Sequence, residues 1–230
     1  MRIAIISDIH SNLEAVEAML KEIKLQRIKI IWAAGDIVGY GANPNEVINL
    51  LRKENAVMIK GDHDHEAVKL NELSWFNEYA QKALIYTNKV LTDENKAFLK
   101  TLKDIHDDTI DNRKIVMVHG SPKDPLHEYV YAKTTDEKLL TMLNKAKSNI
   151  LIMGHTHQPF VRRITGRLIV NPGSLGQPRD YSPDAEYCIL DPKYMQATIH
   201  RVKYDIETAA KKIITAGLPH YLADRLFNGR

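Results

Sequence analysis

Five short apolar segments, each running directly into a polar tip, constrain the fold more than any other feature of this 230-residue chain. The segments are rich in β-branched residues and continuously apolar, as strands buried on both faces of a sheet are. They are Arg2–Ser7, Lys29–Ala34, Ala56–Lys60, Lys114–His119 and Asn149–Met153. Apolar residues at helical spacing separate them, over Asn12–Arg27, from Asn43-Pro44 onward and over Thr134–Lys147. Strand–helix alternation of this kind predicts an α/β fold.

Two regions interrupt the alternation. Residues from about His65 to Asn112 contain two or three helical patterns and no convincing strand, which indicates a helical insertion. From Phe160 onward, short alternating runs predict hairpins, the first closed by a tight turn at Thr165-Gly166. A helix over Ile206–Ala216 and a short one ending at Phe227 follow. Because no linker, repeat or low-complexity segment is present, we expect one domain over residues 1–230, with the helical insert at about 65–112.

Charge and composition exclude several classes of protein. Lys and Arg number 32 against 29 Asp and Glu, and they are spread along the chain, whereas nucleic-acid-binding proteins cluster them. A single cysteine, Cys188, rules out an internal disulfide framework and a cysteine-rich zinc site. No stretch approaches the roughly 18 apolar residues of a membrane span, and the apolar run at residues 3–6 is too short for a signal peptide. We therefore expect a cytoplasmic protein with no membrane partner, and nucleic acid only as a substrate.

The polar tips gather Asp and His side chains where the predicted strands end. Ligands bind at the carboxyl ends of strands in open α/β sheets, so the tips form a candidate site. Taken singly, Asp8 could cap a helix and His119 could be a packed core residue. Five of the ten histidines fall in the tips, however, and separate structural explanations for all of them are strained. The tips are Asp8-Ile9-His10, Gly35-Asp36, Gly61-Asp62-His63-Asp64, His119-Gly120 and Gly154-His155-Thr156-His157.

The chemistry of these side chains indicates the type of metal centre that they could form. Carboxylates and neutral imidazoles without a thiolate suit Mn, Fe, Zn, Ni or Co, and not copper(I) or an iron–sulfur cluster. There are too many of them for one tetrahedral zinc. Three carboxylates and four histidines fit two ions that share a bridge and lie about 3.5 to 4 Å apart. Such a pair holds a bridging hydroxide at neutral pH and clamps the oxygens of a phosphoryl group.

The order and spacing of the tips resemble the motifs of the calcineurin-like metallophosphoesterases, and these motifs span residues 7–157. Asn171-Pro172-Gly173-Ser174 and the following Gly176–Asp180 resemble the tail of a small prokaryotic branch related to the bacterial phosphodiesterase YfcE. With the helical insert and the C-terminal strands, the likeness covers nearly the whole chain. The resemblance implies a four-layer α-β-β-α sandwich of two mixed sheets with a helical insertion.

The resemblance also implies a role for each residue of the tips. The first metal ion would be held by Asp8, His10, Asp36 and His157, and the second by Asp36 as a bridge with Asp62, His119 and His155. His63 matches the histidine that protonates the leaving oxygen or stabilises the charge of the transition state. Asp64 stands where a carboxylate usually follows that histidine, and Asn12 stands near the substrate phosphate. The expected cofactor is two divalent metal ions. Mn is the first candidate, and Fe, Zn, Ni, Co and Mg are the alternatives.

Two departures from the family pattern change the expected chemistry. The usual third motif has Asn where this chain has Asp62, which can still supply one oxygen ligand but lowers the charge of the centre by one unit. The protein-phosphatase branch carries an Arg shortly after the bridging Asp, and this chain has none between Asp36 and Gly41. The chain therefore lacks the arginine that would bind a terminal phosphate dianion, and we expect a diester monoanion as the substrate.

Three further features are candidates for substrate contact. Arg179 could grip phosphate oxygens with its guanidinium fork, although an ion pair with Asp180 is the simpler alternative. Tyr40 follows the bridging Asp36 closely and could line the cleft, or pack within its loop. Trp75, Phe76 and Tyr79 are expected to form a small core of the insert rather than a base-stacking platform.

These observations predict a metal-dependent phosphoesterase with a small phosphoester substrate. The expected reaction is phosphodiester hydrolysis by a metal-bridging hydroxide, with His63 assisting the leaving group. The nearest alternative is a phosphomonoesterase or protein phosphatase that uses the same site. A non-catalytic scaffold is a further alternative, because the retromer subunit resembles these enzymes, but the presence of His63 argues against it.

Overall fold

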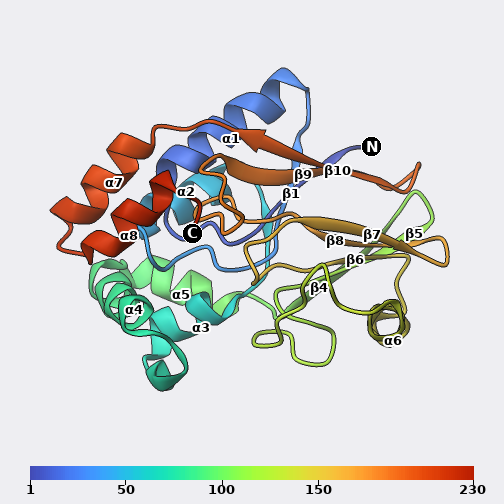
Figure 1. The fold of residues 1–230 in the computed structure, drawn as a ribbon, viewed down its shortest axis with the longest axis horizontal. Helices are drawn as coiled ribbons and strands as arrows, with labels where there is room; N and C mark the ends of the chain where they lie inside the picture. Colours follow the sequence, from blue (N-terminus) through green and yellow to red (C-terminus); the bar gives the residue numbers. More distant parts are fainter.

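The computed structural model describes all 230 residues and contains two five-stranded sheets that face each other (Figure 1). The first sheet has the order β10-β9-β1-β2-β3 and the second β4-β5-β6-β8-β7. In the first, β1 is parallel to β2 and antiparallel to β9, so the sheet is mixed. In the second, β5, β6 and β8 run parallel, and the edge strands β4 and β7 are antiparallel to their neighbours. The strands are β1 (Ile3–Ile6), β2 (Ile30–Ala33), β3 (Val57–Met58), β4 (Ile105–Ile110), β5 (Arg113–Val118), β6 (Ile150–Ile152), β7 (Phe160–Ile164), β8 (Arg167–Asn171), β9 (Ala185–Asp191) and β10 (Gln196–Val202).

Helices cover the outer face of each sheet. The helices are α1 (Leu13–Leu25), α2 (Pro44–Lys53), α3 (Asp62–Lys69), α4 (Glu78–Val90), α5 (Asp93–Thr101), α6 (Asp136–Ala146), α7 (Ile206–Thr215) and α8 (His220–Asp224). Two short 3₁₀ turns, η1 (Leu73–Trp75) and η2 (Arg225–Phe227), accompany them. None of the helices combines the length and the apolar composition needed to span a membrane.

The alternating side chains of the central strands explain the layering. In β1, Ile3 and Ile5 join a core between the two sheets, while Ala4 and Ile6 join a second core beneath α1 and α2. A third core lies between the second sheet and α6. Since strands buried on both faces carry apolar residues at every position, the continuous apolar runs of the sequence are accounted for. The predicted four-layer α-β-β-α sandwich is confirmed.

One expectation about the insert is wrong. The sequence suggested no strand between about His65 and Asn112, but β4 (Ile105–Ile110) pairs along its length with β5. Four of its six residues are exposed, and Asp107 and Asp108 lie on it, because it is the edge strand of the second sheet. Charged side chains protect such edges from pairing with other chains, and they also hide the strand from a hydrophobicity pattern. The helical part of the region comprises α3, η1, α4 and α5.

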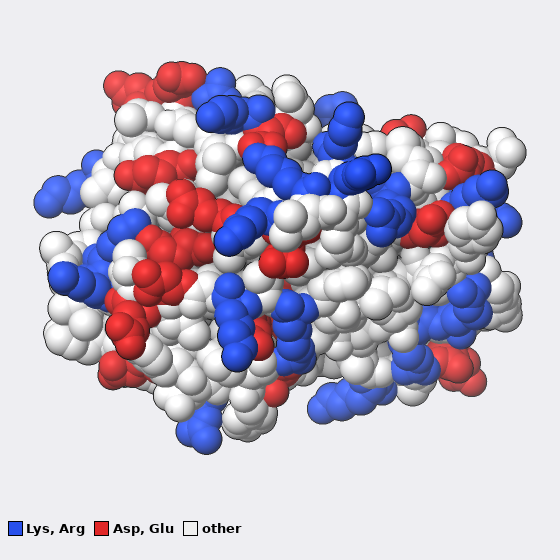
Figure 2. All heavy atoms as spheres, turned by 90° about the horizontal axis from the view of Figure 1, so that it is seen from above, with Lys and Arg blue, Asp and Glu red and all other residues white.

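The predicted C-terminal elements are confirmed with small shifts in their bounds. Thr165 and Gly166 both have positive φ angles, 46° and 79°, as the two-residue turns that match the twist of a hairpin require. Acidic and basic side chains are both spread over the face of the molecule seen in Figure 2, in small groups of each sign. This distribution agrees with the dispersed charge of the sequence.

Candidate metal centre

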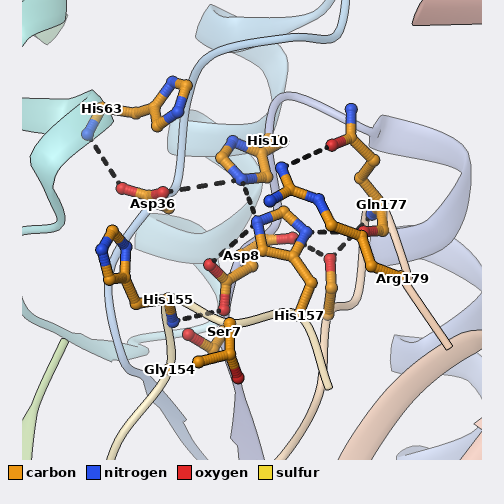
Figure 3. Close-up of polar contacts among 12 residues, drawn as sticks. Ser7, Asp8, His10, Asp36, His63, Gly154, His155, His157, Gln177 and Arg179 are labelled. Carbon is orange, nitrogen blue, oxygen red and sulfur yellow. Dashed lines mark hydrogen bonds and ion pairs between the residues drawn. The ribbon is translucent and has the colours of Figure 1, made fainter. Parts of the chain in front are cut away.

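The seven predicted metal ligands converge at one end of the two sheets, and all of them are buried. Figure 3 shows five of them: Asp8, His10, Asp36, His155 and His157. The loops after β1 and β2 supply three of them, α3 supplies Asp62 from its first turn, and the loops after β5 and β6 supply the rest. Two groups of potential ligand atoms result, each within 4.8 Å of one another: Asp8, His10 and His157, and then Asp36, Asp62, His119 and His155. A third group links His10, Asp36 and His63.

The first group surrounds the side chain of His157. Its Nε2 lies 3.1 Å from His10 Nε2 and 3.3 Å from Asp8 Oδ1. The Oδ1 atom of Asp8 is buried and has no hydrogen-bond donor, whereas Oδ2 accepts a bond from the backbone N–H of His155. A buried carboxylate oxygen without a donor is costly, so a cation between these three atoms would remove an unfavourable arrangement.

The second group is arranged around His119. Its Nε2 lies 3.2 Å from Asp62 Oδ1 and 3.1 Å from His155 Nδ1, and the same Asp62 oxygen is 3.3 Å from His155 Nδ1. Asp62 therefore aims an oxygen at two imidazole nitrogens, as a metal ligand would.

Asp36 lies between the two groups. Its Oδ2 atom is 3.5 Å from His10 Nε2 and 3.5 Å from His119 Nε2. Its Oδ1 atom accepts a hydrogen bond of 3.0 Å from the backbone N–H of His63, which fixes the orientation of the carboxylate. One oxygen of Asp36 thus faces one imidazole of each group.

Backbone carbonyls determine which ring nitrogen of three histidines is free to bind a cation. The Nδ1 atoms of His10, His119 and His157 lie 3.0, 2.8 and 2.6 Å from the carbonyl oxygens of Val38, Ala34 and Gln177. Since a carbonyl only accepts, each Nδ1 must carry the proton, and each Nε2 of a neutral ring presents a lone pair to the cluster. The Nε2 atoms of His10 and His157 then face each other as two acceptors, an arrangement that a cation between them satisfies.

The electrostatics of the cluster favour the same interpretation. Burial lowers the pKa of His10 and of His157 well below the usual value, which keeps both imidazoles neutral. Burial also opposes a charge on His119, yet the Asp36 carboxylate raises the pKa of that imidazole well above its usual value. The site thus has a strongly negative potential. A divalent ion that replaces the proton at Nε2 of His119 would leave carboxylates and neutral imidazoles, a donor set that fits first-row divalent ions.

The backbone is strained where the ligands are attached. Asp8, His10, Asp36, His155 and His157 all have positive φ angles, between 48° and 69°. For a residue other than glycine, a sparsely populated backbone conformation costs about 1 to 3 kcal/mol. Residues in such conformations cluster at ligand sites. Gly39, at φ 98°, passes so close to His63 that a Cβ there would lie 2.5 Å from Nδ1 of that ring.

The segment after β8 supports the cluster from below. The Asn171 amide donates to the Gly154 carbonyl at 2.8 Å, and the Ser174 hydroxyl donates to the Asp8 carbonyl at 2.7 Å. Gln177 contributes the carbonyl that orients His157. The tail motif recognised in the sequence therefore holds the two loops that carry four of the candidate ligands, Asp8, His10, His155 and His157.

His63 and Asp64 lie in the first turn of α3 and have different surroundings. The His63 ring lines the cleft beside the cluster, among Tyr40, His10 and Phe76, and makes no hydrogen bond within the chain. Burial lowers the pKa of His63 to about 3, so the imidazole is neutral. Both oxygens of Asp64 accept backbone bonds, from Gly61 at 2.9 Å and Val38 at 3.0 Å. Asp64 thus anchors the start of the helix that carries His63.

The three predicted substrate residues lie in two different environments. The Asn12 amide is engaged by the chain, because it caps α1 through Ala15 and donates to Gly176. Tyr40 and Arg179 line the cleft, with the Arg179 guanidinium 5.7 Å from the Tyr40 ring centre. Asp180, the alternative partner of Arg179, forms its ion pair with Arg201 instead. The cleft therefore contains a guanidinium that no carboxylate neutralises.

Sequence reasoning missed three aromatic side chains of the cleft. Trp75 was expected in the core of the insert, but it is 76% exposed and lines the cleft with His127 and Tyr129. Tyr79 is half-buried, but it stacks on Tyr221 of α8 and so packs with the C-terminal helices rather than in a core of the insert alone. Tyr129 stacks on the metal-ligand candidate His155 with ring centres 3.8 Å apart. His127 and Tyr129 lie outside every motif, so no local pattern could have identified them.

Comparisons with known proteins agree with this geometry. Residues 1–195 match the calcineurin-like phosphoesterase superfamily domain. Over 99% of the chain, the sequence is 41% identical to the uncharacterized protein MJ0912 of Methanocaldococcus jannaschii, of which 98% is covered. The solved structure of a metallophosphoesterase from Sphaerobacter thermophilus is 34% identical, with full coverage of both chains and a TM-score of 0.86.

A more distant likeness concerns the branch recognised in the sequence. The structure of YfcE, a phosphoesterase from E. coli, covers 88% of this chain and is itself wholly covered, at 16% identity and a TM-score of 0.51. At this level of identity the likeness shows a common fold.

Proposed function

The chain belongs to the calcineurin-like phosphoesterase superfamily, and from that premise we propose that it is a dinuclear metal-dependent hydrolase of phosphodiesters. The observation that carries the proposal is the position of Asp36, whose Oδ2 atom faces one imidazole of each ligand group at 3.5 Å. The substrate is a small phosphoester, and residues 1–230 act as one domain. The cytoplasmic location stays a prediction.

The donor set assigns residues to each of two ions, for which manganese is the first candidate. Asp8, His10, Asp36 and His157 would hold one, and Asp36, Asp62, His119 and His155 the other. When bound, such a pair supplies a hydroxide nucleophile at neutral pH and neutralises charge that develops on the phosphoryl oxygens. The three carbonyls that fix the imidazole tautomers keep the Nε2 atoms in place for binding.

His63 and Asp64 have different proposed roles. The neutral His63 ring lines the cleft beside Asp36, where an N–H group can donate to the leaving oxygen as the bond to phosphorus breaks. Asp64 does not face the cleft with a free oxygen, so we assign it a positioning role: it holds the first turn of α3 against Val38.

Charge in the cleft supports a diester rather than a monoester. Among the residues that line the cleft, Arg179 is the one Lys or Arg, and it rests against Tyr40 and Gln177. One guanidinium suits the single charge of a diester. Because a fork-shaped cation such as the Arg179 guanidinium can also bind a terminal phosphate, phosphomonoester hydrolysis is the second candidate activity.

A panel of esters tests the proposal. Protein loaded with manganese would be assayed on diesters and monoesters that share one leaving group, such as methyl p-nitrophenyl phosphate and p-nitrophenyl phosphate. We expect kcat/KM to be higher for the diester by about tenfold or more. A preference for the monoester would support the second candidate, and no turnover of either ester with any divalent ion would support a non-catalytic role.

The Asp62→Asn variant tests the departure from the family pattern. Hydrogen bonds from His119 and His155 hold the pKa of Asp62 well below the usual value, although burial acts in the opposite direction, so the side chain is an anion. An amide is a weaker ligand than a carboxylate, and we expect metal affinity to fall at least about tenfold. At saturating metal the rate per site should rise. The Asp62 carboxylate repels the negative charge that develops on the phosphoryl group, and the asparagine side chain is neutral. Metal titration and saturated turnover measure both quantities. Unchanged affinity would mean that Asp62 is not a ligand.

A further inference from the structure

The cleft beside the metal centre has a polar floor and an aromatic wall. Its volume is about 360 Å³, near the lower end of the roughly 300 to 1,000 Å³ typical of sites for small ligands. Metal-ligand candidates such as Asp36 and His155 form the floor, and Tyr40, Trp75, Phe76 and Tyr129 line the sides. One phosphoryl group on the floor leaves most of this volume for the alcohol portion of a diester.

Trp75 is the aromatic side chain that the protein itself leaves uncovered. It is 76% exposed, and its nearest aromatic neighbour is His127, with ring centres 6.0 Å apart and planes tilted by 30°. The adjacent Phe76 packs its edge against His63 with ring centres 4.9 Å apart, and it also packs against the core beneath the first sheet. Trp75 therefore contributes little to the core, while its indole ring is available to a ligand.

The position of Trp75 places its indole ring on the side of the cleft where the leaving alcohol would lie. Trp75 and Phe76 are neighbours in the chain, and Phe76 contacts His63, the residue proposed to assist the leaving oxygen. The alcohol that leaves is therefore the portion that extends toward the indole ring. Tyr129, stacked on His155, borders the same cleft from the opposite group of ligands.

The part of the wall that carries His127 and Tyr129 is held in place by bonds within the chain. The turn that precedes His127 is closed by backbone bonds from Gly120 to Pro125 at 2.6 Å and from Ser121 to Asp124 at 2.8 Å. Glu128 accepts a bond from the Ser121 hydroxyl and pairs with Lys138 of α6 at 2.8 Å. A rigid aromatic surface binds a flat ring without the entropic cost of ordering a loop.

We propose that the cleft takes a small nucleotide phosphodiester whose nucleobase stacks on Trp75 and whose nucleoside is the leaving alcohol. This inference rests on the proposed function. Water adds its oxygen to phosphorus, the bond from phosphorus to the nucleoside oxygen breaks, and that oxygen gains a proton. Arg179 is the one cationic side chain among the lining residues, so the cleft lacks the row of charges that would follow a nucleic-acid strand. One base-sized space with one guanidinium suits a mononucleoside or dinucleotide ester.

A matched pair of substrates measures the contribution of the base. The methyl phosphodiester of adenosine at its 5′-oxygen and the corresponding ester of ribose differ at C1′, where the first carries adenine and the second a hydroxyl group. We expect a higher kcat/KM for the adenosine ester, with adenosine and methyl phosphate as products. In Trp75→Ala the ratio of the two kcat/KM values should fall about tenfold, the usual contribution of one stacked base. Trp75→Phe should restore most of the ratio, and Tyr194→Ala, an exposed aromatic residue on the β9–β10 turn, should leave it unchanged.

Tryptophan fluorescence tests the stacking without turnover. The chain has two tryptophans, and Trp32 is buried at 2% exposure, so Trp75 is the one that a ligand can reach. Adenosine monophosphate should quench the emission, ribose 5-phosphate should not, and Trp75→Phe should abolish the response. An unchanged substrate ratio in Trp75→Ala together with no quenching would overturn the inference. Failure to hydrolyse any diester while quenching persists would instead overturn the proposed function and leave the base site standing.

Discussion

Replacing Asp36 with asparagine is expected to lower kcat/KM by about three orders of magnitude, the size of effect that loss of a bridged metal pair would have. The Oδ2 atom of Asp36 faces His10 and His119 at 3.5 Å each, so one substitution removes the anion from both ligand groups. The Oδ1 atom, which accepts the His63 backbone N–H, has a counterpart in the asparagine carbonyl, so α3 should keep its position. Initial rates at saturating manganese measure the loss.

A surface variant controls for the loss of an acidic side chain as such. Asp108 lies exposed on the edge strand β4, and Asp108→Asn should retain the activity of the unmodified protein. Circular dichroism and thermal unfolding of both variants would show whether Asp36→Asn folds. A folded Asp36→Asn protein with more than about a tenth of the original activity would exclude a bridging role.

The His63→Ala variant should lose about a hundredfold or more in turnover while it retains its metal ions. The His63 ring makes no hydrogen bond within the chain, so the imidazole is free to act on the substrate. The loss should be largest for poor leaving groups, and smaller for nitrophenolate, which hardly needs stabilisation. Turnover of a series of diesters with leaving groups of graded acidity gives this dependence.

Two controls accompany the His63 measurement. His220→Ala removes an exposed histidine at the start of α8 and should leave turnover unchanged. Metal analysis of His63→Ala should match that of the unmodified protein. Equal losses for good and poor leaving groups would argue that His63 positions other groups instead of assisting the leaving oxygen.

The convergence of the ligands could be predicted because strand ends are visible in the sequence. The apolar runs that become β1, β2, β5 and β6 stop where Asp and His begin, and parallel strands bring their carboxyl ends to one edge. The four-layer arrangement could not be predicted from the apolar runs alone, because the runs do not show that β5 and β6 belong to a different sheet from β1 and β2. The resemblance to a known family supplied that assignment.

Features that depend on tertiary contact could not be predicted. The carbonyls of Val38, Ala34 and Gln177 fix the imidazole tautomers, and a backbone carbonyl carries no signature of residue type. The edge strand β4 has no apolar pattern, because solvent covers it. The exposure of Trp75 depends on where η1 meets the cleft, whereas hydrophobicity alone favoured a core position.

Metal stoichiometry tests the central claim most directly. Protein saturated with manganese and then freed of unbound ions by gel filtration would be analysed for metal and for protein concentration. Seven buried candidate ligands, with Asp36 between the two groups, predict two ions per chain, and fewer than one in Asp36→Asn, since both groups lose an anionic ligand. A chain that binds a single ion with full activity, or an Asp36→Asn variant that still binds two, would contradict the bridged centre.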